Sequence, residues 1–468
     1  MTIRFNNSLS HRLQDFQPLQ DGKAGLYTCG PTVYNFAHIG NFRAYVFEDL
    51  LKRTLLFNGL SVKHVMNLTD VDDKTIKGSQ AAHIPLQDFT QTYKDAFFSD
   101  IKTLRLIPAD VYPAATAHIP EMIALIQKLF ELGIAYQAED KSVYFSLAKW
   151  PRYGQLVHIE RDQMLTGARF SMDEYTKESV GDFALWKAWD EKDGDVAWDS
   201  PWGKGRPGWH IECSAMASKY LGKTFDIHCG GIDNMFPHHE DEIAQSEAAN
   251  GCRFVNYWLH CAHLMVDGQK MSKSLGNFYT LRDILAKGYT GREIRWVLIA
   301  THYRQSLNFS FKALDDARTV IQRLDALTAR LREAAALPDA GLDDAAPILA
   351  RQLDAFRDAL NDDLNISAAL AALFDLLHEL NRLLDRGACA GKAAQSALDT
   401  LAKIDTVLAV CQPDEGDGVP AEIQKMADDR QAARKARDFA TADRLRKELD
   451  DLGWTVEDTP KGPRVKRK

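Results

Sequence analysis

The feature of this sequence that most constrains its fold is an alternation of strand-like and helical segments. Apolar, strand-like runs at 24–29 and 61–67 flank a helical stretch at 40–58, which is the pattern of two parallel strands joined by a crossover helix. The alternation returns with a helix at 211–221 and the strand FDIH at 225–228. Two such halves predict an α/β fold with a doubly wound sheet.

The pattern changes between and after these halves. An amphipathic helix at 119–132 and a loop rich in Trp, Asp and Gly indicate an insertion, and Ala- and Leu-rich helical spacing after Phe311 predicts a helical bundle broken at 338–341 and 387–391. A linker at 412–418 precedes a charged helix and a hairpin. The expected boundaries are 22–110 and 205–265 for the two halves of the α/β domain, 111–204 for the insertion, 266–312 for a loop and stem-contact region, 313–411 for the bundle and 419–468 for a small α+β module.

Charge and cysteine content limit the classes of function. The formal net charge is −8, and seven cysteines are scattered over 468 residues, which argues against a general phosphate binder and against a disulfide framework. We find neither a signal peptide nor an apolar run long enough to span a bilayer. We therefore expect a cytoplasmic protein that binds no membrane and whose thiols are free to bind metal. Because the sequence shows no long uncapped apolar stripe, we expect a monomer.

The short motif HIGN, His38 to Asn41, stands between the first strand and the helix that follows. Gly40 at the start of that helix lets a nucleotide lie against the backbone, while polar side chains and helix N–H groups meet its phosphates. Similar residues also occur at ordinary helix starts. The motif alone therefore decides little.

A second motif, KMSKS at 270–274, follows a predicted hairpin turn at 267–268. The ammonium groups of Lys270 and Lys273 on a loop of small residues suit a mobile clamp on a triphosphate, where negative charge must be neutralised as pyrophosphate leaves. Solvated basic loops are common, but this order of residues downstream of HIGN is not. The pair of motifs therefore favours ATP chemistry.

A metal site is predicted from residues that are remote in the chain. In the segment FPHHEDE, His238 and Glu242 are four residues apart on a helix, so they share one face, although such a pair is more often a surface pair than a metal site. Cys29 ends the first strand and Cys213 lies on the helix at 211–221, and the two halves of such a sheet converge on one crevice. Two thiolates, one imidazole and one carboxylate make a plausible tetrahedral zinc site.

Two neighbouring residues compete as ligands. His239 adjoins His238, but its side chain is expected to point about 100° away from the face that holds Glu242. Cys229 lies in the turn HCGG, which suits the close approach of a nucleotide. The remaining cysteines are expected to be buried small hydrophobes: Cys252, Cys261, Cys389 and Cys411.

Two further segments follow predicted strands. Gly231 and Asp233 lie in the glycine-rich segment GGID, where a carboxylate can accept hydrogen bonds from ribose hydroxyls, although an ordinary tight turn explains the same residues. The segment NLTDVDD at 67–73 offers a hydroxyl and carboxylates that could hold an amino group. A solvated loop explains some of these aspartates equally well.

Taken together, these elements resemble the cysteinyl-tRNA synthetases, which are class I aminoacyl-tRNA synthetases. The resemblance runs in order through almost the whole chain and includes LYTCGPTVYNFAHIGN, SPWGKGRPGWHIECSAM, HYRQSLNFS, FRDALNDDLNISAALAALFDLLHELN and ADRLRKELDDLGWTVEDTP. It implies a class I Rossmann-type catalytic domain with an insertion, followed by the bundle and an anticodon-binding module.

The resemblance also implies the reaction and the residues that serve it. The chain would activate L-cysteine with ATP and Mg²⁺ and transfer the cysteinyl group to tRNA(Cys), with HIGN and KMSKS binding ATP. A pocket that reads shape separates cysteine from serine by only about 1–3 kcal/mol, whereas zinc strongly prefers a thiolate. The residues implied are the zinc ligands Cys29, Cys213, His238 and Glu242 and the amino-acid pocket residues Thr69, Trp209 and His228.

The chain departs from the family pattern in two places. The first signature commonly ends in histidine, where this chain has Asn41. Asparagine can donate a hydrogen bond to a phosphate but cannot become an imidazolium, so charge stabilisation is expected to rely more on His38, Lys270 and Lys273. Cys229 stands where glycine is common, which leaves its role open.

Two other functions fit parts of the pattern. An ATP-dependent ligase that joins cysteine to an amino sugar would share the catalytic half but lack a full anticodon-binding module. A noncatalytic zinc protein that binds tRNA would not need intact signatures. The basic segment at 430–468 favours tRNA as the acceptor, although about half of its cations are expected to form only a solvated face. Six of them are predicted on one helix: Arg434, Lys435, Arg437, Arg444, Arg446 and Lys447.

Overall fold

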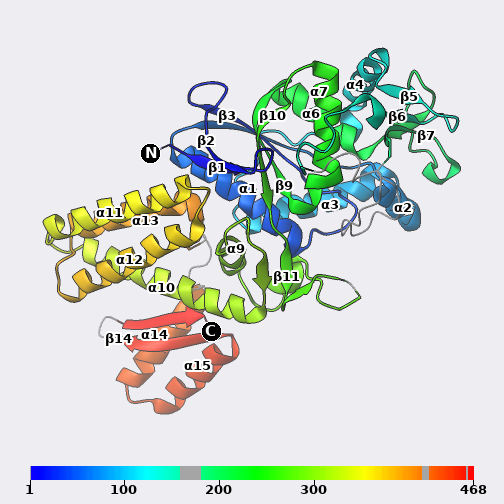
Figure 1. Cartoon of the computed structure of the whole chain (residues 1–468). Coiled ribbons are helices and arrows are strands. Elements are labelled where there is room, and N and C mark those ends of the chain that lie inside the picture. The colour runs from blue at the N-terminus through cyan, green and yellow to red at the C-terminus, as the bar shows by residue number, and fades with distance from the viewer. Residues whose placement is uncertain (1, 159–180, 273, 414–420, 460–461, 468) are drawn as a thin grey trace. The chain divides into compact units, whose positions relative to one another are not determined.

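The protein folds into two compact units, Met1–Ala409 and Val410–Lys468, as a computed structural model shows (Figure 1). The structure describes residues 2–158, 181–272, 274–413, 421–459 and 462–467. Within these ranges no helix has both the length and the apolar character needed to cross a membrane.

The first unit is built on a four-stranded parallel sheet in the order β10–β9–β3–β4. The chain runs to β4 on one side of β3 and to β9 and β10 on the other, so the strand order reverses between β3 and β9. Ligands of such sheets bind at the carboxyl ends of the strands beside this switch point. The strands are β3 (Lys23–Thr28), β4 (Ser61–Met66), β9 (Phe225–Gly231) and β10 (Val255–Cys261).

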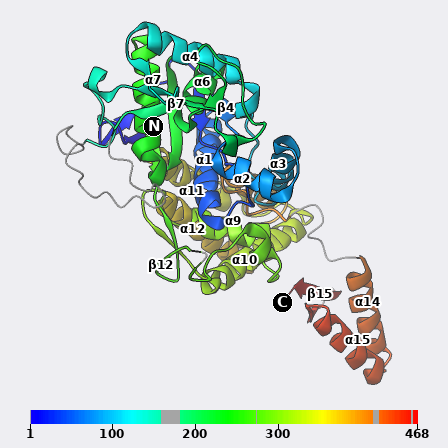
Figure 2. The same cartoon turned by 90° about the vertical axis from the view of Figure 1, so that its right-hand side faces the viewer.

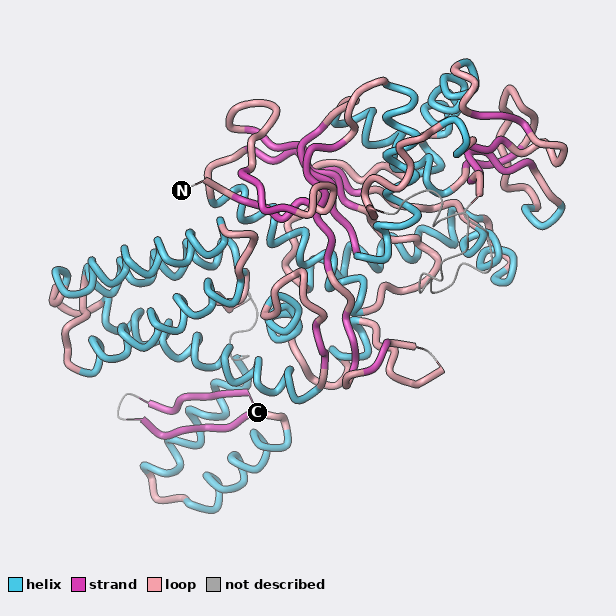
Figure 3. The backbone as a smooth tube through the Cα atoms, viewed as in Figure 1, coloured by secondary structure: helices cyan, strands magenta, loops and turns pink. Residues whose placement is uncertain are grey.

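Helices cover both faces of this sheet (Figure 3). Successive side chains of a strand point to opposite faces, so Leu26 packs in the apolar cluster of α1 (Ile39–Phe57) and its neighbour Tyr27 packs in that of α6 (Trp209–Leu221). Both side chains are fully buried. The predicted order of strand, helix and strand at 24–67 is confirmed, with element ends that differ by at most one residue.

The segment expected to be an insertion packs against α6. An antiparallel sheet, β5–β6–β7–β8, and α4 share one apolar cluster that contains Met122, Phe145, Trp186 and Ile211. Figure 2 shows α4 beside α6 and α7. Packing of this kind fixes the two helices that carry candidate ligands. The elements are α4 (Ile119–Glu131), β5 (Ala135–Gln137), β6 (Val143–Phe145), β7 (Phe183–Ala188), β8 (Gly205–Pro207) and α7 (Glu240–Asn250).

Two helices that the sequence pattern did not predict, α2 (Asp73–Ala82) and α3 (Leu86–Thr103), follow β4. Asp72 begins α2 with a capping box, because its carboxylate accepts the N–H of Thr75 at 2.7 Å and the hydroxyl of Thr75 accepts the N–H of Asp72 at 2.8 Å. This Asp-x-x-Thr spacing was a readable signal within a segment interpreted as a loop.

The predicted hairpin turn before KMSKS is confirmed. β11 and β12 pair antiparallel, and Asp267 and Gly268 between them have φ of 49° and 75°, as a tight two-residue hairpin requires. The remaining strand of this small sheet, β13, lies parallel to β11. The elements here are β11 (Leu264–Val266), β12 (Gln269–Lys270), α8 (Leu281–Leu285), α9 (Gly291–Ile299) and β13 (Leu307–Phe309). Lys270, the last residue of β12, is exposed to solvent.

The predicted bundle consists of α10 (Phe311–Ala335), α11 (Leu342–Asn361), α12 (Ile366–Asp385) and α13 (Lys392–Leu408). Both predicted breaks are confirmed, but a third one was missed. Asp363 and Leu364 have positive φ and Asn365 caps α12, so the segment NDDLN turns the chain. Asp363 is held there by Tyr303 and Arg304, which the helical spacing of the sequence could not reveal.

Two arginines tie α1 and α9 to the end of the bundle. Arg295 of α9, whose side chain is fully buried, donates to the carboxylate of Asp49 on α1 and to the carbonyl of Leu408. Arg53 of α1 donates to the carbonyl of Thr406 at 2.7 Å. The last carbonyl groups of a helix lack intrahelical partners and favour nearby cations. The end of α13 is therefore anchored to the helix that HIGN begins.

The second unit contains two helices, α14 (Ala421–Lys435) and α15 (Phe439–Asp451), and a hairpin of β14 (Trp454–Thr459) and β15 (Gly462–Arg467). The predicted hairpin is confirmed. The prediction of one helix for all six basic residues is wrong, because Arg437 lies between the two helices with a φ of 61°. All six side chains are nevertheless exposed.

Candidate active site

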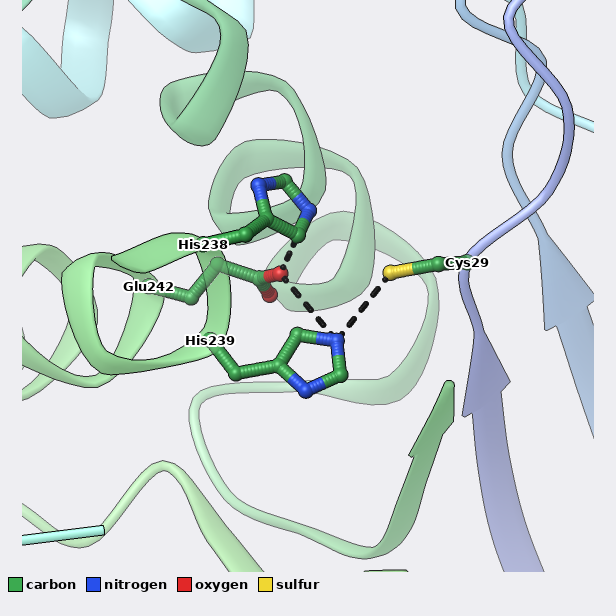
Figure 4. A group of neighbouring side chains, drawn as sticks. All are labelled: Cys29, His238, His239 and Glu242. Atoms are coloured by element: carbon green, nitrogen blue, oxygen red, sulfur yellow. Dashed lines mark hydrogen bonds and ion pairs between the residues drawn. The ribbon is translucent and has the colours of Figure 1, made fainter. Parts of the chain in front are cut away.

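Four buried side chains converge beside the switch point of the sheet (Figure 4). Cys29 follows the end of β3, and His238, His239 and Glu242 come from the turn Met235–His239 and the first turn of α7. Their ligand atoms all lie within 4.8 Å of one another. Two elements far apart in the sequence thus supply sulfur, nitrogen and oxygen donors to one point.

The prediction that His239 points away from this cluster is wrong. Its Nε2 lies 3.3 Å from Sγ of Cys29 and 4.0 Å from Oε1 of Glu242. The reason is local: Met235–His239 is a wide π-type turn in which Phe236 has extended dihedral angles, φ −140° and ψ 134°. The regular 100° step of an α-helix therefore does not apply before Glu240.

Cys213 on α6 contacts two members of the same cluster, Cys29 and His238. Its side chain is 1% exposed. Burial would raise the pKa of the Cys213 thiol, but hydrogen bonds with Cys29 and His238 bring that pKa down to about 6. A hydrogen bond with Cys213 and burial raise the pKa of Cys29 well above its ordinary value. Of these two neighbouring thiols, Cys213 is thus the one that ionises first.

The charges in the cluster call for a cation at its centre. Burial would lower the pKa of His238, but Glu242 and Cys213 outweigh it and raise that pKa to about 10. Burial would raise the pKa of Glu242, but His228 and His238 lower it to about 2. Two buried anions therefore face one imidazole, and a divalent metal ion can replace the proton between them.

The geometry also fits a metal ion. Oε1 of Glu242 accepts no hydrogen bond from any described residue, although Nε2 of His238 lies 3.0 Å from it. Such atoms face a common point rather than each other. A tetrahedron with metal–ligand distances of about 2.0–2.3 Å separates its ligand atoms by about 3.3–3.8 Å, so small shifts would close this cluster around one ion. Its sulfur, nitrogen and oxygen donors suit zinc.

A second layer of rings orients these groups. Nε2 of His228 lies 3.0 Å from Oε2 of Glu242, and the ring of Trp209 stacks on that of His238 with centroids 4.2 Å apart. The sequence reasoning missed two members of this layer. His210 contacts Nδ1 of His238 at 2.8 Å, and His260 contacts Nδ1 of His239 at 2.8 Å. Their only signal was position, beside Trp209 and near the end of a strand.

HIGN and KMSKS lie against each other. A side chain at Gly40 would come within 3.1 Å of Cε of Met271, and the N–H of Ile39 donates to the carbonyl of Tyr279 at 3.0 Å. Asn277 braces the KMSKS loop by bonding to Ser272 and Lys270. Lys273 lies outside the described residues. The segments predicted to bind ATP are thus neighbours at the start of α1.

Asn41 has a structural role in addition to any contact with ATP. Oδ1 of Asn41 accepts the N–H of His38 at 3.1 Å, while Nδ1 of His38 accepts the N–H of Asn41 at 3.2 Å. This reciprocal capping box begins α1. Because Oδ1 is engaged in the cap, the amide NH₂ of Asn41 is the group suited to donate to a phosphate.

The segment HCGG before Asp233 was predicted to be a turn. This prediction is wrong, because the segment forms the end of β9. Cys229 belongs to this strand, is fully buried and packs with Phe47 and Leu259 on the α1 face, so it belongs to the apolar core and not to the cluster of Figure 4. Gly231 ends the strand, and Oδ1 of Asp233 would lie 2.3 Å from any Cβ there. Asp233 therefore folds back over the strand end.

Most acidic side chains of the segment NLTDVDD are engaged elsewhere. Asp70 forms an ion pair with Lys94 at 2.6 Å and accepts two hydrogen bonds from Thr116. Asp72 caps α2, and Asp73 pairs with Arg206. Three aspartates that could have held an amino group thus stabilise the fold.

Thr69 of this segment contacts an acid on α6 instead. Its hydroxyl donates to Oε2 of Glu212 at 2.9 Å. Both side chains are 1% exposed. Glu212 precedes Cys213 in the sequence but was not singled out there.

The remaining cysteines were predicted to be buried, and three of them are: Cys261, Cys389 and Cys411. The prediction is wrong for Cys252, which is exposed. It follows Gly251, the left-handed residue that ends α7, so it lies on a surface turn.

Comparisons with known proteins agree with this architecture. Residues 15–319 match the catalytic domain described as tRNA synthetases class I (C), residues 355–412 match the DALR domain, and residues 416–465 match the cysteinyl-tRNA ligase anticodon binding domain. A cysteine–tRNA ligase from Protochlamydia amoebophila is 49% identical over 469 residues, which cover 99% of this chain and 98% of the relative. The chain belongs to the cysteinyl-tRNA synthetase family. A second cysteine–tRNA ligase, from Chlamydia pneumoniae, is 51% identical over 466 residues, covering 99% of this chain and 98% of that protein.

Solved structures confirm the class I Rossmann-type fold of this family member. Methionyl-tRNA synthetase of Mycobacterium tuberculosis in complex with methionyl-adenylate superposes with a TM-score of 0.60 at 16% identity, covering 83% of this chain and 90% of that chain. A ternary LeuRS–tRNA–LeuAMS complex from Agrobacterium radiobacter K84 gives a TM-score of 0.58 at 13% identity, covering 86% of each chain. At these identities the likeness concerns the fold.

Proposed function

We propose that this member of the cysteinyl-tRNA synthetase family activates L-cysteine with ATP and Mg²⁺ and transfers the cysteinyl group to tRNA(Cys), working as a cytoplasmic monomer. The observation that carries the proposal is the meeting, beside one switch point, of a buried cluster suited to zinc with the two signatures suited to ATP. The full-length relatives, named cysteine–tRNA ligases, support the same reaction.

The proposed zinc ligands are Cys29, Cys213, His238 and Glu242. The contacts of Cys213 with Cys29 and His238 support this set. His239 is the competing nitrogen, because its Nε2 lies 3.3 Å from Sγ of Cys29. Its Nε2 is, however, 4.0 Å from Oε1 of Glu242, whereas that of His238 is 3.0 Å away. When bound, zinc would take the sulfur of cysteine as a thiolate ligand, which the hydroxyl of serine replaces badly.

The chain's own groups position the reactants for adenylate formation. The carboxylate of cysteine attacks the α-phosphate of ATP, and pyrophosphate leaves. His38, the amide of Asn41 and the ammonium groups of Lys270 and Lys273 are proposed to hold the phosphates and to offset the charge that develops on them. Gly40 would let the nucleotide approach the start of α1. Gly231 leaves the space that the side chain of Asp233 takes over the end of β9, and Asp233 would accept hydrogen bonds from the ribose.

The C-terminal part supports tRNA as the acceptor. Residues 416–465 match an anticodon binding domain, a part that the rival amino-sugar ligase would lack. We propose that the module at 419–468 reads the anticodon and keep the other predicted domain boundaries as proposals. Two of the six basic residues predicted on one helix form ion pairs within the module, Arg434 with Asp458 and Arg444 with Glu448, so the other four are better placed to meet phosphates.

Cysteine-dependent exchange of pyrophosphate into ATP, measured with and without tRNA, tests the proposed function. Exchange with cysteine but not serine, followed by cysteinylation of tRNA(Cys), is expected. Transfer to an amino sugar would favour the rival ligase. Absence of any exchange by the zinc-loaded protein would leave only a noncatalytic binding role.

Replacing Lys270 or Lys273 with alanine is expected to slow adenylate formation at least about tenfold, because removing one donor to a developing charge costs several kcal/mol. Zinc content should stay stoichiometric, since both lysines lie on the KMSKS loop. Single-turnover pyrophosphate release measures the effect. An unchanged rate in both variants would remove the KMSKS loop from the chemistry.

Replacing Asn41 with aspartate separates its two roles. Aspartate keeps the oxygen that caps α1 but loses the amide donor and brings a negative charge to the phosphates. The melting temperature should therefore stay unchanged, while the KM for ATP rises at least about tenfold. Asn41→Ala, which loses the cap as well, should in addition lower stability by about 1 kcal/mol. A normal KM in Asn41→Asp would confine Asn41 to the cap.

A further inference from the structure

Three side chains on one face of α6 front the cluster, and the role of one of them is open. Trp209, Glu212 and Cys213 stand at positions i, i+3 and i+4 of the helix, so they lie on the same face. Trp209 stacks on His238, and Cys213 hydrogen-bonds with the cluster. Glu212 therefore lies one turn after an aromatic wall and directly before a candidate metal ligand.

The carboxylate of Glu212 has one engaged oxygen and one without a partner. Oε2 accepts the hydroxyl proton of Thr69 at 2.9 Å. Oε1 is buried and accepts no hydrogen bond from any residue that the structure describes. A buried carboxylate oxygen without a donor is unfavourable, and a cationic donor satisfies it best. The geometry of Glu212 thus suits a positively charged group that arrives with a ligand.

Thr69 is set to receive a donor as well. A hydroxyl has one proton, and that of Thr69 goes to Glu212. Nδ2 of Asn67 donates to the same oxygen at 3.2 Å. The hydroxyl oxygen of Thr69 can therefore still accept one N–H through its remaining lone pair. It has no proton left to donate to a carboxylate or carbonyl group.

The nearby aspartates do not compete for this role. Asp70 is neutralised by Lys94 and bonded to Thr116, and Asp72 caps α2. Glu212 is therefore the acidic side chain next to Thr69 that retains a free oxygen within the described chain.

We infer that Glu212 binds the α-ammonium group of the amino acid through Oε1, with Thr69 accepting a second N–H of the same group. This inference rests on the proposed activation of L-cysteine and assigns the residue that recognises its amino end. In cysteine the ammonium group and the sulfur lie close together, and α6 supplies both Glu212 and the residue after it, Cys213. The helix thereby holds the amino end of the substrate next to the metal ligand that fronts its sulfur.

Glu212→Gln tests the inference, because glutamine keeps the shape and can still accept from Thr69 but places an NH₂ where the ammonium would bind. The KM for L-cysteine in pyrophosphate exchange is expected to rise at least about tenfold, as loss of a charge-assisted hydrogen bond implies. The KM for ATP and the zinc content should not change. If the variant folds poorly, Thr69→Val gives a second test, with a smaller rise in the KM for L-cysteine.

A second measurement separates recognition of the ammonium from a merely structural role. 3-Mercaptopropionate has the thiol and carboxylate of cysteine but no amino group. The ratio of its inhibition constant to the KM for L-cysteine measures how strongly the site prefers a ligand with an amine. That preference should fall at least about tenfold in Glu212→Gln. In the control Glu247→Gln, which neutralises another buried acid bonded to the N–H of Phe254 and to Arg152, it should stay as in the unaltered protein.

An unchanged preference in both Glu212→Gln and Thr69→Val, with stoichiometric zinc, would overturn the inference while leaving cysteine activation intact. Failure of the proposed function has a different signature, because the unaltered protein would then show no cysteine-dependent exchange.

Discussion

Replacing His238 with alanine is expected to remove the zinc and at least about 100-fold of the kcat/KM for cysteine activation, since even partners that only orient a metal ligand are worth 10–100-fold. Nε2 of His238 and Oε1 of Glu242 face one point at 3.0 Å from each other. Without the imidazole, the two anions Cys213 and Glu242 lose the group that balances their charge. The measurement is elemental analysis of protein purified without chelators, together with exchange kinetics.

The identity of the fourth ligand is tested by a matched pair of variants. Cys213→Ser should lose zinc and, with it, the preference for cysteine over serine, whereas His239→Ala should keep both. The two residues are equally suited as controls for each other because both are buried and both contact Cys29. The opposite pattern, in which His239→Ala loses the metal and Cys213→Ser retains it, would replace Cys213 by His239 in the ligand set.

Metal binding should also release protons, which gives a test without mutation. In the metal-free cluster the pKa of His238 is about 10 and that of Cys29 is raised, so both groups carry protons near neutral pH. Ligands must be deprotonated to bind zinc. Titration of the metal-free protein with zinc in buffers of different ionisation enthalpy should therefore reveal proton release that grows smaller as pH rises toward 10.

What the sequence could predict of this site followed from regular geometry. Cys29 was found because parallel strands end at a common edge. Glu242 was found from its spacing of four residues after His238, although His238 lies in the wide turn before α7 and only Glu242 lies on that helix. His239 was misjudged because the turn before α7 is wider than an α-helix, as Phe236 shows. A local departure from helical geometry leaves no periodic signal in the residues themselves.

The sequence was least informative about polar residues whose partners come from other elements. Asp70 was a candidate ligand for an amino group, yet Lys94 and Thr116 claim its oxygens. In the sequence, Glu212 is only one acid in a helix. In the structure, Thr69 donates to its Oε2, and its Oε1 accepts no hydrogen bond from the described residues. Which carboxylate is engaged is decided by tertiary contacts, and residue type and spacing carry no record of it.

Replacing Arg295 with methionine is expected to destabilise the first unit by about 3–5 kcal/mol, which is the usual effect of removing one partner of a buried ion pair. Arg295 is fully buried and its Nη2 lies 2.5 Å from Oδ2 of Asp49. Burial would raise the pKa of Asp49, but Arg295 and Arg53 outweigh it and hold that pKa below its ordinary value. The contribution is therefore fully present at pH 7 and lost as the pH falls through the lowered pKa.

Chemical unfolding at pH 7 measures the loss, and two further variants define its origin. Arg292→Met on the same helix should cost less, about 1 kcal/mol, because its partner Asp325 is 37% exposed and stays hydrated. The double variant Asp49→Leu with Arg295→Met should recover part of the loss, because it removes both halves of the fully buried pair, while Arg53 keeps its hydrogen bond to the carbonyl of Thr406. Equal losses for Arg292→Met and Arg295→Met would mean that burial of the pair is irrelevant.

Arg295→Met should also slow catalysis, because it loosens the placement of α1. Asp49 lies on α1, which begins with His38, and Arg295 also holds the carbonyl of Leu408 at the end of α13. Loosening this junction leaves the zinc cluster untouched but frees the helix that carries HIGN. At a temperature where Arg295→Met remains folded, the rate of adenylate formation should therefore fall while zinc stays stoichiometric, and unaltered exchange kinetics would limit the junction to stability alone.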